Sequence, residues 1–304
     1  MIPPLLQQIL AYIGQKDPAH AARLRTFISQ KDLAYLTKAT WFFSRYKSYI
    51  ESKGKNIEYG LDCYLKLCAH MVHERLKFLR SGQYANRSFA DVETQIYLNP
   101  EAFEYHMHGL AFAQFFWPDQ YTRFRFFSDH IKNELISGGR YLEIGGGHAL
   151  YILEAINQVS KYVDFQLVDI SPSSMALAQG ITQGLAIDYQ VMDIYDFASN
   201  VKYDFITIGE VIEHVEAPLP LLIRVRELLA PKGRVFISTP ANAPTIDHIF
   251  LFNNADEIRA MLAKAGFRIL REATQYSTNV SEEKAHKLKV ALMYAAFVES
   301  SSDS

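Results

Sequence analysis

The sequence predicts an α/β fold in the second half of the chain, preceded by an all-helical block. An apolar segment with one acidic residue, Tyr141–Ile144, leads directly into three glycines at 145–147, and apolar residues recur at helical spacing from Leu150. This order indicates a strand, a tight turn and a helix, because glycine adopts the positive φ angles that tight turns need. Strand-like and helix-like segments then alternate as far as about residue 265, which is typical of a mostly parallel sheet. Before residue 135 the apolar spacing is helical instead.

The helical block is rich in aromatic residues. Apolar side chains recur every three or four residues in segments such as Gly60–Leu79, as amphipathic helices require. Aromatic residues gather in Trp41–Tyr46 and in Phe103–Phe127. Packing between helices accounts for many of them, and the others suit the wall of a ligand pocket, since such pockets are mostly apolar. We therefore expect one domain over 1–135 and a second over 136–304.

The glycine turn indicates a nucleotide-like ligand. In open α/β sheets such ligands bind outside the carboxyl ends of the strands, where bare backbone permits a close approach. Gly145 and Gly147 supply the first two glycines of the dinucleotide fingerprint, but Leu150 occupies its third position. A nicotinamide-dependent oxidoreductase is therefore the less favoured alternative.

Acidic residues end the next two predicted strands. Val163–Asp169 has the character of a strand, and its last carboxylate lies 22 residues after Gly147. An acidic residue at about that distance from the glycine turn is placed to accept hydrogen bonds from ribose hydroxyls. The third strand, Ile187–Met192, ends at Asp193.

The remaining strands complete the predicted sheet. The fourth strand, Tyr203–Gly209, leads into the segment Glu210-Val-Ile-Glu-His214-Val. A leucine-rich helix end and a proline-glycine turn precede the fifth strand, Arg234–Thr239. Two last strands, Phe267–Arg271 and Val290–Val298, have a polar connection without a crossover helix between them, so they can pair antiparallel.

These five segments, from 141 to about 240, together resemble the class I S-adenosylmethionine-dependent methyltransferases. Ala149 departs from the family pattern, which has a glycine at this position. The Glu-Val-Ile-Glu-His-Val segment resembles the small-molecule branch that includes the quinone-precursor methyltransferases. The resemblance implies a Rossmann-like, seven-stranded, mostly parallel sheet with an antiparallel last strand. It also implies that the helical domain over 1–135 serves as a lid, substrate-binding or dimerisation domain, and that 136–304 binds S-adenosylmethionine and holds the catalytic site.

The resemblance also implies a set of cofactor-binding residues at the strand ends. In the family, the acidic residue after the third strand meets the adenine amino group, and its neighbour covers the ring. The expected cofactor-binding residues are Glu143, Gly145, Gly146, Gly147, Asp169, Ile170, Asp193, Ile194 and Glu210.

Candidate catalytic residues follow strands four and five. His214 lies four residues after Glu210, so both can face one side of a helical turn, and histidine is the natural base near neutral pH. The structural alternative is that His214 stabilises the loop by a hydrogen bond to its backbone. Asp247 and His248 lie in a long loop stiffened by proline, and we expect His248 to face the acceptor. Glu213 is expected to face solvent.

A metal site is a further hypothesis. His108 (or His106), His214, Asp247 and His248 could supply imidazole and carboxylate ligands, which suit zinc or iron. A bound divalent metal would polarise a carbonyl acceptor and favour its enolate. This arrangement resembles the metal-dependent 2-oxo acid C-methyltransferases, so metal-assisted C-methylation of a 2-oxo acid is an alternative to methylation with a histidine base.

The composition argues against nucleic-acid and membrane partners. A net charge of −2 without a basic stripe argues against nucleic acid. No apolar run approaches the roughly 18 residues that span a bilayer, and the N-terminus lacks a signal-peptide pattern, so we expect no membrane partner. The two cysteines, Cys63 and Cys68, fall on different faces of a helix, which fits a reducing compartment and a cytoplasmic protein. A small-molecule substrate is expected, and the aromatic helical block suits a homodimer interface.

The acceptor atom stays open among oxygen, nitrogen and carbon. A non-catalytic regulator that binds the cofactor is also consistent with the sequence.

Overall fold

The computed structural model describes residues 1–97, 99–135, 138–159 and 162–301. Within them, seven strands form one sheet in the order β3-β2-β1-β4-β5-β7-β6. The strands are β1 (Arg140–Ile144), β2 (Asp164–Asp169), β3 (Asp188–Val191), β4 (Tyr203–Gly209), β5 (Leu229–Ala241), β6 (Phe267–Tyr276) and β7 (Leu292–Ser300). β1 to β5 pair parallel, and β7 pairs antiparallel with both β5 and β6. The predicted fold class, including the antiparallel last strand, is confirmed.

Helices cover both faces of this sheet. On one face lie α7 (Pro118–Glu134), α8 (Leu150–Gln158) and α9 (Pro172–Ile181); on the other lie α10 (Pro218–Leu228) and α11 (Ala255–Lys264). The central strands are therefore almost continuously buried, as in β1, where four of five residues are buried. The connection between β6 and β7, expected to be a polar loop, contains a short helix, α12 (Glu282–Lys287).

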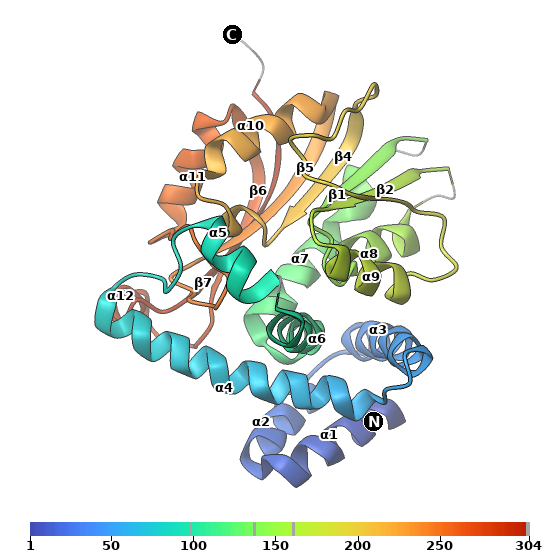
Figure 1. Ribbon diagram of the computed structural model, residues 1–304, viewed down its shortest axis with the longest axis vertical. Coiled ribbons are helices and arrows are strands. Elements are labelled where there is room, and N and C mark those ends of the chain that lie inside the picture. The colour runs from blue at the N-terminus through green and yellow to red at the C-terminus, as the bar shows by residue number, and fades with distance from the viewer. Residues whose placement is uncertain (98, 136–137, 160–161, 302–304) are drawn as a thin grey trace.

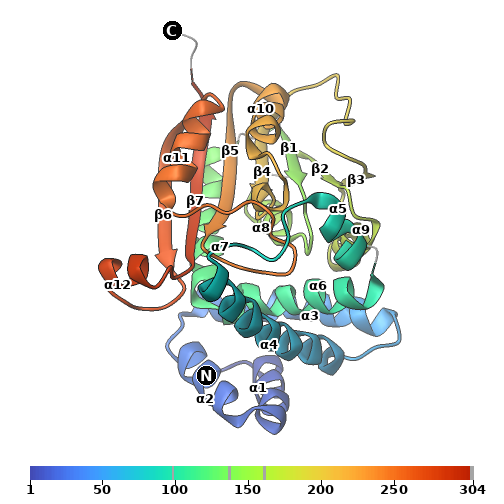
Figure 2. The same ribbon diagram turned by 60° about the vertical axis from the view of Figure 1, so that its left-hand side comes forward.

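The N-terminal helices form a block at the carboxyl edge of the sheet (Figures 1 and 2). They are α1 (Pro4–Lys16), α2 (Pro18–Ser29), α3 (Leu33–Ser52), α4 (Ile57–Ser81), α5 (Phe89–Val92), the π-helix η1 (Glu93–Tyr97) and α6 (Pro100–Phe116). Asp32 and Asn56 cap α3 and α4 by accepting hydrogen bonds from the backbone N–H of Tyr35 and Tyr59. Gly82 ends α4 at a φ of +72°.

Aromatic packing joins the block to the sheet. Phe43 stacks on Phe112 with ring centroids 5.0 Å apart. On α7, Phe127 contacts Tyr151 and Phe236, each at 4.9 Å between centroids. Helical-block and sheet side chains share one hydrophobic core, so the block holds a fixed position over the sheet edge. The division into domains 1–135 and 136–304 stays a prediction.

Candidate active site

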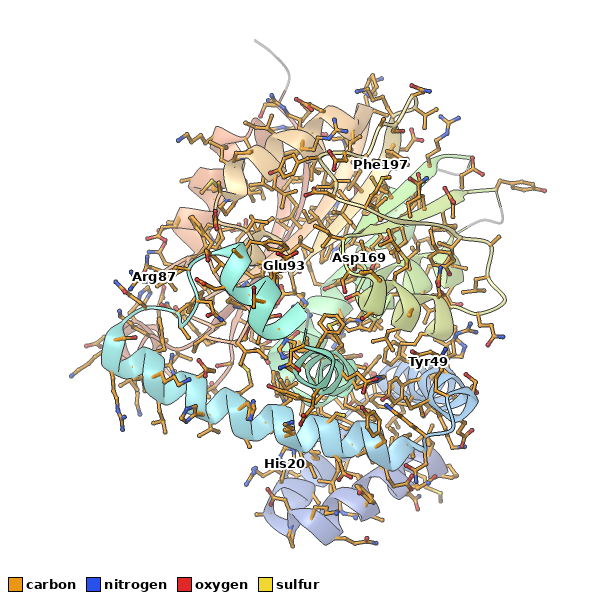
Figure 3. All side chains as sticks on the ribbon, in the orientation of Figure 1. His20, Tyr49, Arg87, Glu93, Asp169 and Phe197 are labelled. Carbon is orange, nitrogen blue, oxygen red and sulfur yellow. The ribbon has the colours of Figure 1, made fainter. Side chains whose placement is uncertain are left out.

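A cavity of about 890 Å³ lies between the carboxyl edge of the sheet and the helical block. The loops after β1, β2, β4 and β5 line it from one side, and α4, α6 and α7 line it from the other. Figure 3 shows Asp169 at the centre of the molecule, at the carboxyl end of β2. All nine predicted cofactor-binding residues line this cavity.

The turn after β1 requires glycine for steric reasons. Gly145 and Gly147 have positive φ angles of 69° and 50°. A Cβ on Gly145 would lie 2.5 Å from Cγ2 of Val211, and a Cβ on Gly146 would overlap the side chain of Leu167. Ala149, where the family pattern has glycine, also adopts a left-handed conformation, with φ at 56°. The turn therefore presents bare backbone to the cavity.

The acidic side chains at the ends of β1 to β3 lie in contrasting surroundings. Asp169 accepts hydrogen bonds from the backbone N–H groups of Gly147 (3.3 Å) and Ser171 (2.8 Å), and burial raises its pKa to about 6. Glu143 is 2% exposed and accepts a hydrogen bond from the Tyr141 hydroxyl at 3.1 Å. Burial raises the pKa of Glu143 to about 8. Asp193 instead closes a turn by accepting from a backbone N–H two residues later, at 2.9 Å.

Glu210 is held by a residue from the helical block. Its φ is +57°, and its carboxylate lies 2.5 Å from Nη1 of Arg123 on α7. Ser238 donates a hydrogen bond to the other carboxylate oxygen at 3.0 Å. Arg123 also donates to the side chain of Gln114 at 2.7 Å. The guanidinium is fully buried and lines the cavity, although nothing in the sequence distinguishes it from a surface arginine of an amphipathic helix.

Two polar atoms near the glycine turn lack hydrogen-bond partners. Among the described residues, the Nε of Arg123 and the Nδ1 of His148 are buried and unpaired, and both residues line the cavity. Burial, with Arg123 nearby, lowers the pKa of His148 to about 3. An unsatisfied buried polar group costs about 1–3 kcal/mol, so this end of the cavity is suited to a polar ligand.

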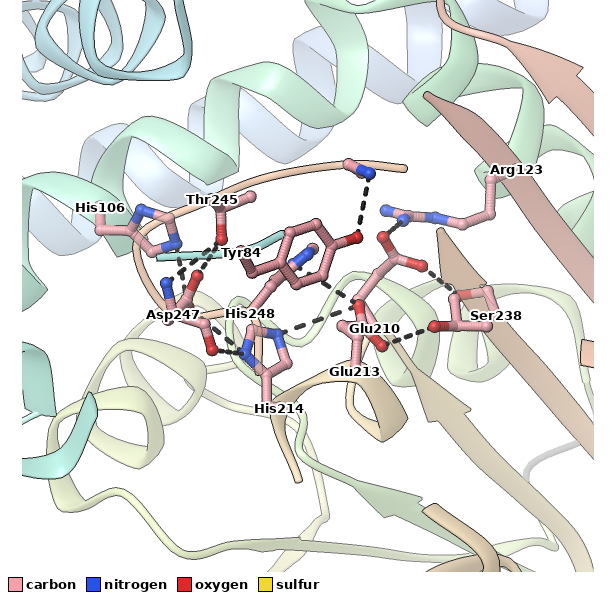
Figure 4. A network of polar contacts seen from close by, with 12 residues as sticks. Tyr84, His106, Arg123, Glu210, Glu213, His214, Ser238, Thr245, Asp247 and His248 are labelled. Atoms are coloured by element: carbon pink, nitrogen blue, oxygen red, sulfur yellow. Dashed lines mark hydrogen bonds and ion pairs between the residues drawn. The ribbon is translucent and has the colours of Figure 1, made fainter. Parts of the chain in front are cut away.

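The opposite wall of the cavity brings together groups from three segments of the chain (Figure 4). His214 ends the 3₁₀ turn η2 (Ile212–His214), and its Nδ1 lies 2.9 Å from the carbonyl oxygen of Asp247. One carboxylate oxygen of Asp247 lies 3.6 Å from the same nitrogen and 3.2 Å from Nε2 of His106 on α6. Thr245 donates a hydrogen bond to the other oxygen. Burial opposes ionisation, but His106 and His214 hold the pKa of Asp247 well below its usual range.

Glu213 and His248 complete this wall. Glu213 is 0% exposed, which contradicts the expectation that it faces solvent. Thr239 donates to one of its carboxylate oxygens at 2.9 Å, and the other lies 3.9 Å from Nε2 of both His214 and His248. Burial raises the pKa of Glu213 well above its usual range. Burial also lowers the pKa of His248 to about 3.

The two alternate histidines of α6 diverge, because residues two apart lie on different sides of a helix. His106 reaches Asp247, whereas Nδ1 of His108 lies 2.9 Å from the Tyr46 hydroxyl inside the helical block. His108 does not line the cavity and lies apart from the other residues of the predicted metal set. The possible metal-binding group found among the described residues is Glu213, His214 and His248, with ligand atoms within 4.8 Å of one another.

Comparisons with known proteins agree with this geometry. Residues 120–272, half of the chain, match a family described as a methyltransferase domain. A ubiquinone biosynthesis O-methyltransferase of Xylella fastidiosa (strain 9a5c) is 31% identical over 116 residues, covering 36% of this chain and 46% of the relative. The protein of that name from Nitrosococcus oceani is 29% identical over 158 residues, covering 49% of this chain and 66% of the relative. The matches thus span about half to two thirds of these relatives.

Among solved structures, the mitomycin 7-O-methyltransferase MmcR is similar in fold. Its TM-score is 0.52 at 13% identity, covering 76% of this chain and 68% of that chain. The solved structure agrees in fold, and the family match confirms the resemblance found in the sequence: this chain belongs to the methyltransferase-domain family.

Proposed function

We propose that this protein transfers a methyl group from S-adenosylmethionine to a small-molecule acceptor. The continuity of the cavity carries the proposal, because the glycine turn, Asp169 and the wall containing His214 and Asp247 line the same space. Methyl displacement requires that donor and acceptor be aligned and that water be kept out. When bound, S-adenosylmethionine supplies a methyl group on a positively charged sulfur.

The unpaired atoms at the glycine turn fit the amino-acid end of this donor. The Nε of Arg123 is a buried, unpaired donor that a carboxylate would satisfy. Asp169 has carboxylate lone pairs for ribose hydroxyls, and Asp193 and Ile194 would border the adenine ring. Glu210 fixes the position of Arg123 through their ion pair.

His214 is the candidate proton acceptor. Its Nδ1 faces only oxygen acceptors, the carbonyl and carboxylate of Asp247, so the neutral ring carries its proton there. Nε2 then holds the lone pair. The side chain of His214 is 19% exposed, against 8% for His248 and 4% for His106, so it is the most accessible imidazole of this wall. We assign His248 and Asp247 to positioning and His214 to proton transfer.

The relatives point to an acceptor hydroxyl. The relatives from Xylella fastidiosa and Nitrosococcus oceani carry the name ubiquinone biosynthesis O-methyltransferase. A hydroxyl must lose its proton on methylation, which gives the base a role. We therefore propose O-methylation of a hydroxylated small molecule. The cytoplasmic location and the homodimer remain proposals, and no helix of the described residues is both long and apolar enough to cross a bilayer.

A second candidate is metal-assisted C-methylation of a carbonyl compound. The observation that favours it is the buried oxygen of Glu213, which has no hydrogen-bond partner and lies 3.9 Å from Nε2 of both His214 and His248. Two imidazoles and a carboxylate suit zinc or iron. Ligand atoms of a tetrahedral zinc site lie about 3.3–3.5 Å apart, so small side-chain movements would suffice. Such an ion would polarise a carbonyl oxygen.

Calorimetry and a transfer assay test these proposals together. Binding of S-adenosylmethionine or S-adenosylhomocysteine, without binding of NAD, is expected from the purified protein. Methyl transfer to hydroxylated aromatic acceptors that survives complete removal of metal would support the base mechanism. Transfer to 2-oxo acids that stops on metal removal and returns on add-back would support the second candidate. Cofactor binding without transfer to any acceptor would instead indicate a regulator.

A further inference from the structure

One face of the molecule exposes large apolar side chains beside the cavity. On the last three turns of α4, Val72, Leu76 and Leu79 are 63%, 49% and 52% exposed. Their spacing of four and three residues places them on one side of the helix. Leu288, directly after α12, is 45% exposed. These four side chains define the α4–α12 face.

Contacts hold the two parts of this face together. Arg75 on α4 donates hydrogen bonds to the carbonyl oxygens of Leu288 and Lys289, each at 2.6 Å. The ammonium of Lys289 lies 5.6 Å from the centroid of the Phe78 ring. Figures 1 and 2 both show α12 near the end of α4 that leads to α5. The apolar residues therefore belong to one surface.

Basic residues surround this surface. Arg80 lies at the end of α4, and Lys284, Lys287 and Lys289 lie in or directly after α12. All four are exposed, and none forms an ion pair within the part of the chain that the structure describes. The acidic residues of α12 are confined to its first turn, at the end away from Leu288.

The face also borders the cavity. Val72 and Leu76 line the cavity as well as the face, together with Met71 and Arg75. Val290 and Leu292, which follow α12 in the chain, line the same cavity. An apolar ligand could thus pass between the α4–α12 face and the cavity while staying in contact with apolar side chains.

We propose that the α4–α12 face docks the protein on an anionic lipid surface. An apolar stripe bordered by unpaired lysine and arginine is the pattern of a segment that lies in the interface, where apolar side chains enter the headgroup region and cations meet anionic lipids. A second copy of the chain fits less well, because a twofold interface would pack two copies of this cation-rich surface against each other. This peripheral attachment departs from the expectation of no membrane partner, and it requires no membrane-spanning helix.

Vesicle flotation tests the proposal with the full chain. The protein is expected to float with vesicles of phosphatidylcholine and phosphatidylglycerol and to stay unbound with phosphatidylcholine alone. Added salt should weaken the binding, because exposed charges are screened. Replacing Arg80, Lys284 and Lys287 by glutamine should lower the partition on the order of 100-fold.

A second variant tests the apolar side chains of the α4–α12 face. Leu79→Glu with Leu288→Glu removes apolar contact without altering the cavity wall, and it should abolish flotation. The matched control is Leu33→Glu, because Leu33 is 78% exposed on α3 and lies outside the face. For the charges, Lys53→Gln with Lys132→Gln is the control. Both controls should float as the unmodified protein does.

Three results would overturn the proposal. The unmodified protein could fail to bind anionic vesicles, or the face variants could bind as well as the controls. Light scattering could also show a dimer that Leu79→Glu with Leu288→Glu dissociates, which would assign the face to a second copy of the chain. Calorimetry with S-adenosylhomocysteine on each variant separates loss of docking from loss of folding, because the cofactor side of the cavity is unchanged.

Discussion

Binding of S-adenosylmethionine at pH 7 is expected to release close to one proton from Glu143. The buried carboxyl of Glu143 lines the cavity and has a pKa raised to about 8 by burial, so at pH 7 it is about 90% protonated. The donor carries an ammonium and a sulfonium, and a nearby positive charge favours the ionised carboxylate. If the bound cation lowers this pKa to about 6 or below, roughly 0.8–0.9 proton leaves on binding.

Calorimetry in two buffers measures this proton. The binding enthalpy in phosphate and in Tris at the same pH and ionic strength should differ by the number of protons released times the difference in buffer ionisation enthalpy. Glu143→Gln keeps the size of the side chain and its hydrogen bond from Tyr141, and it should remove the difference. Glu154→Gln is the matched control, since Glu154 is equally buried but lies outside the cavity, where it pairs with Lys38.

Equal enthalpies in the two buffers would refute the assignment of Glu143 to the cofactor site. Release that persists in Glu143→Gln would show that another group supplies the proton. Asp169 cannot supply it in full, because a pKa of about 6 leaves only about 0.1 proton to lose at pH 7. The size of the release therefore distinguishes the two carboxyl groups.

Three more predictions follow from the site. Asp169→Asn should weaken S-adenosylmethionine binding by about 1.5–3 kcal/mol in calorimetry, and binding by the unmodified protein should weaken as the pH falls below about 6, where Asp169 gains a proton. His214→Gln should slow turnover about 10²–10⁴-fold while the cofactor dissociation constant stays within about twofold; equal damage to both would contradict its role as base. Glu143→Gln should raise the free energy of unfolding at pH 8 by on the order of 4 kcal/mol, because the stability contributed by the protonated group is present below pH 4.5 and is lost as the pH rises through 8. Glu154→Gln should instead lower it by breaking the pair with Lys38, and urea titration measures both.

The glycine-turn side of the cavity could be predicted from the sequence because its information is local. The predicted residues there lie at or just after the ends of β1 to β4, and strand ends in a parallel sheet meet at one edge. The steric need for glycine at 145 and 146, against Val211 and Leu167, is the structural reason for the motif that the sequence displays.

The acceptor side could not be predicted in the same way. Glu213 looked solvent-exposed because a three-residue 3₁₀ turn has no periodicity from which burial can be inferred. The predicted helix separates His106 from His108, but the sequence does not show which of the two faces Asp247. Arg123 contacts Glu210 across 87 positions of the chain, and neither residue carries a local signal of that pairing.

The loop after β5, which carries Asp247 and His248, depends on the helical block for its position. The Tyr84 hydroxyl accepts a hydrogen bond from the backbone N–H of Ala243 at 3.0 Å, and Asn86 donates to the carbonyl oxygen of Ile246 at 2.5 Å. Ile249, in the same loop, forms a small hydrophobic cluster with Val92 of α5 and Ile96 of η1.

These contacts explain why family membership determines the donor side more than the acceptor. The family match begins at residue 120, so it includes the glycine turn and the strand ends but none of α1 to α6. Tyr84, Asn86 and His106 all lie before the match, yet they hold or complete the wall opposite the glycine turn. Sequence changes in that block can therefore alter which acceptor binds without changing the glycine turn or the strand ends. Identifying the acceptor of this protein requires the side chains of the helical block, which the family match does not cover.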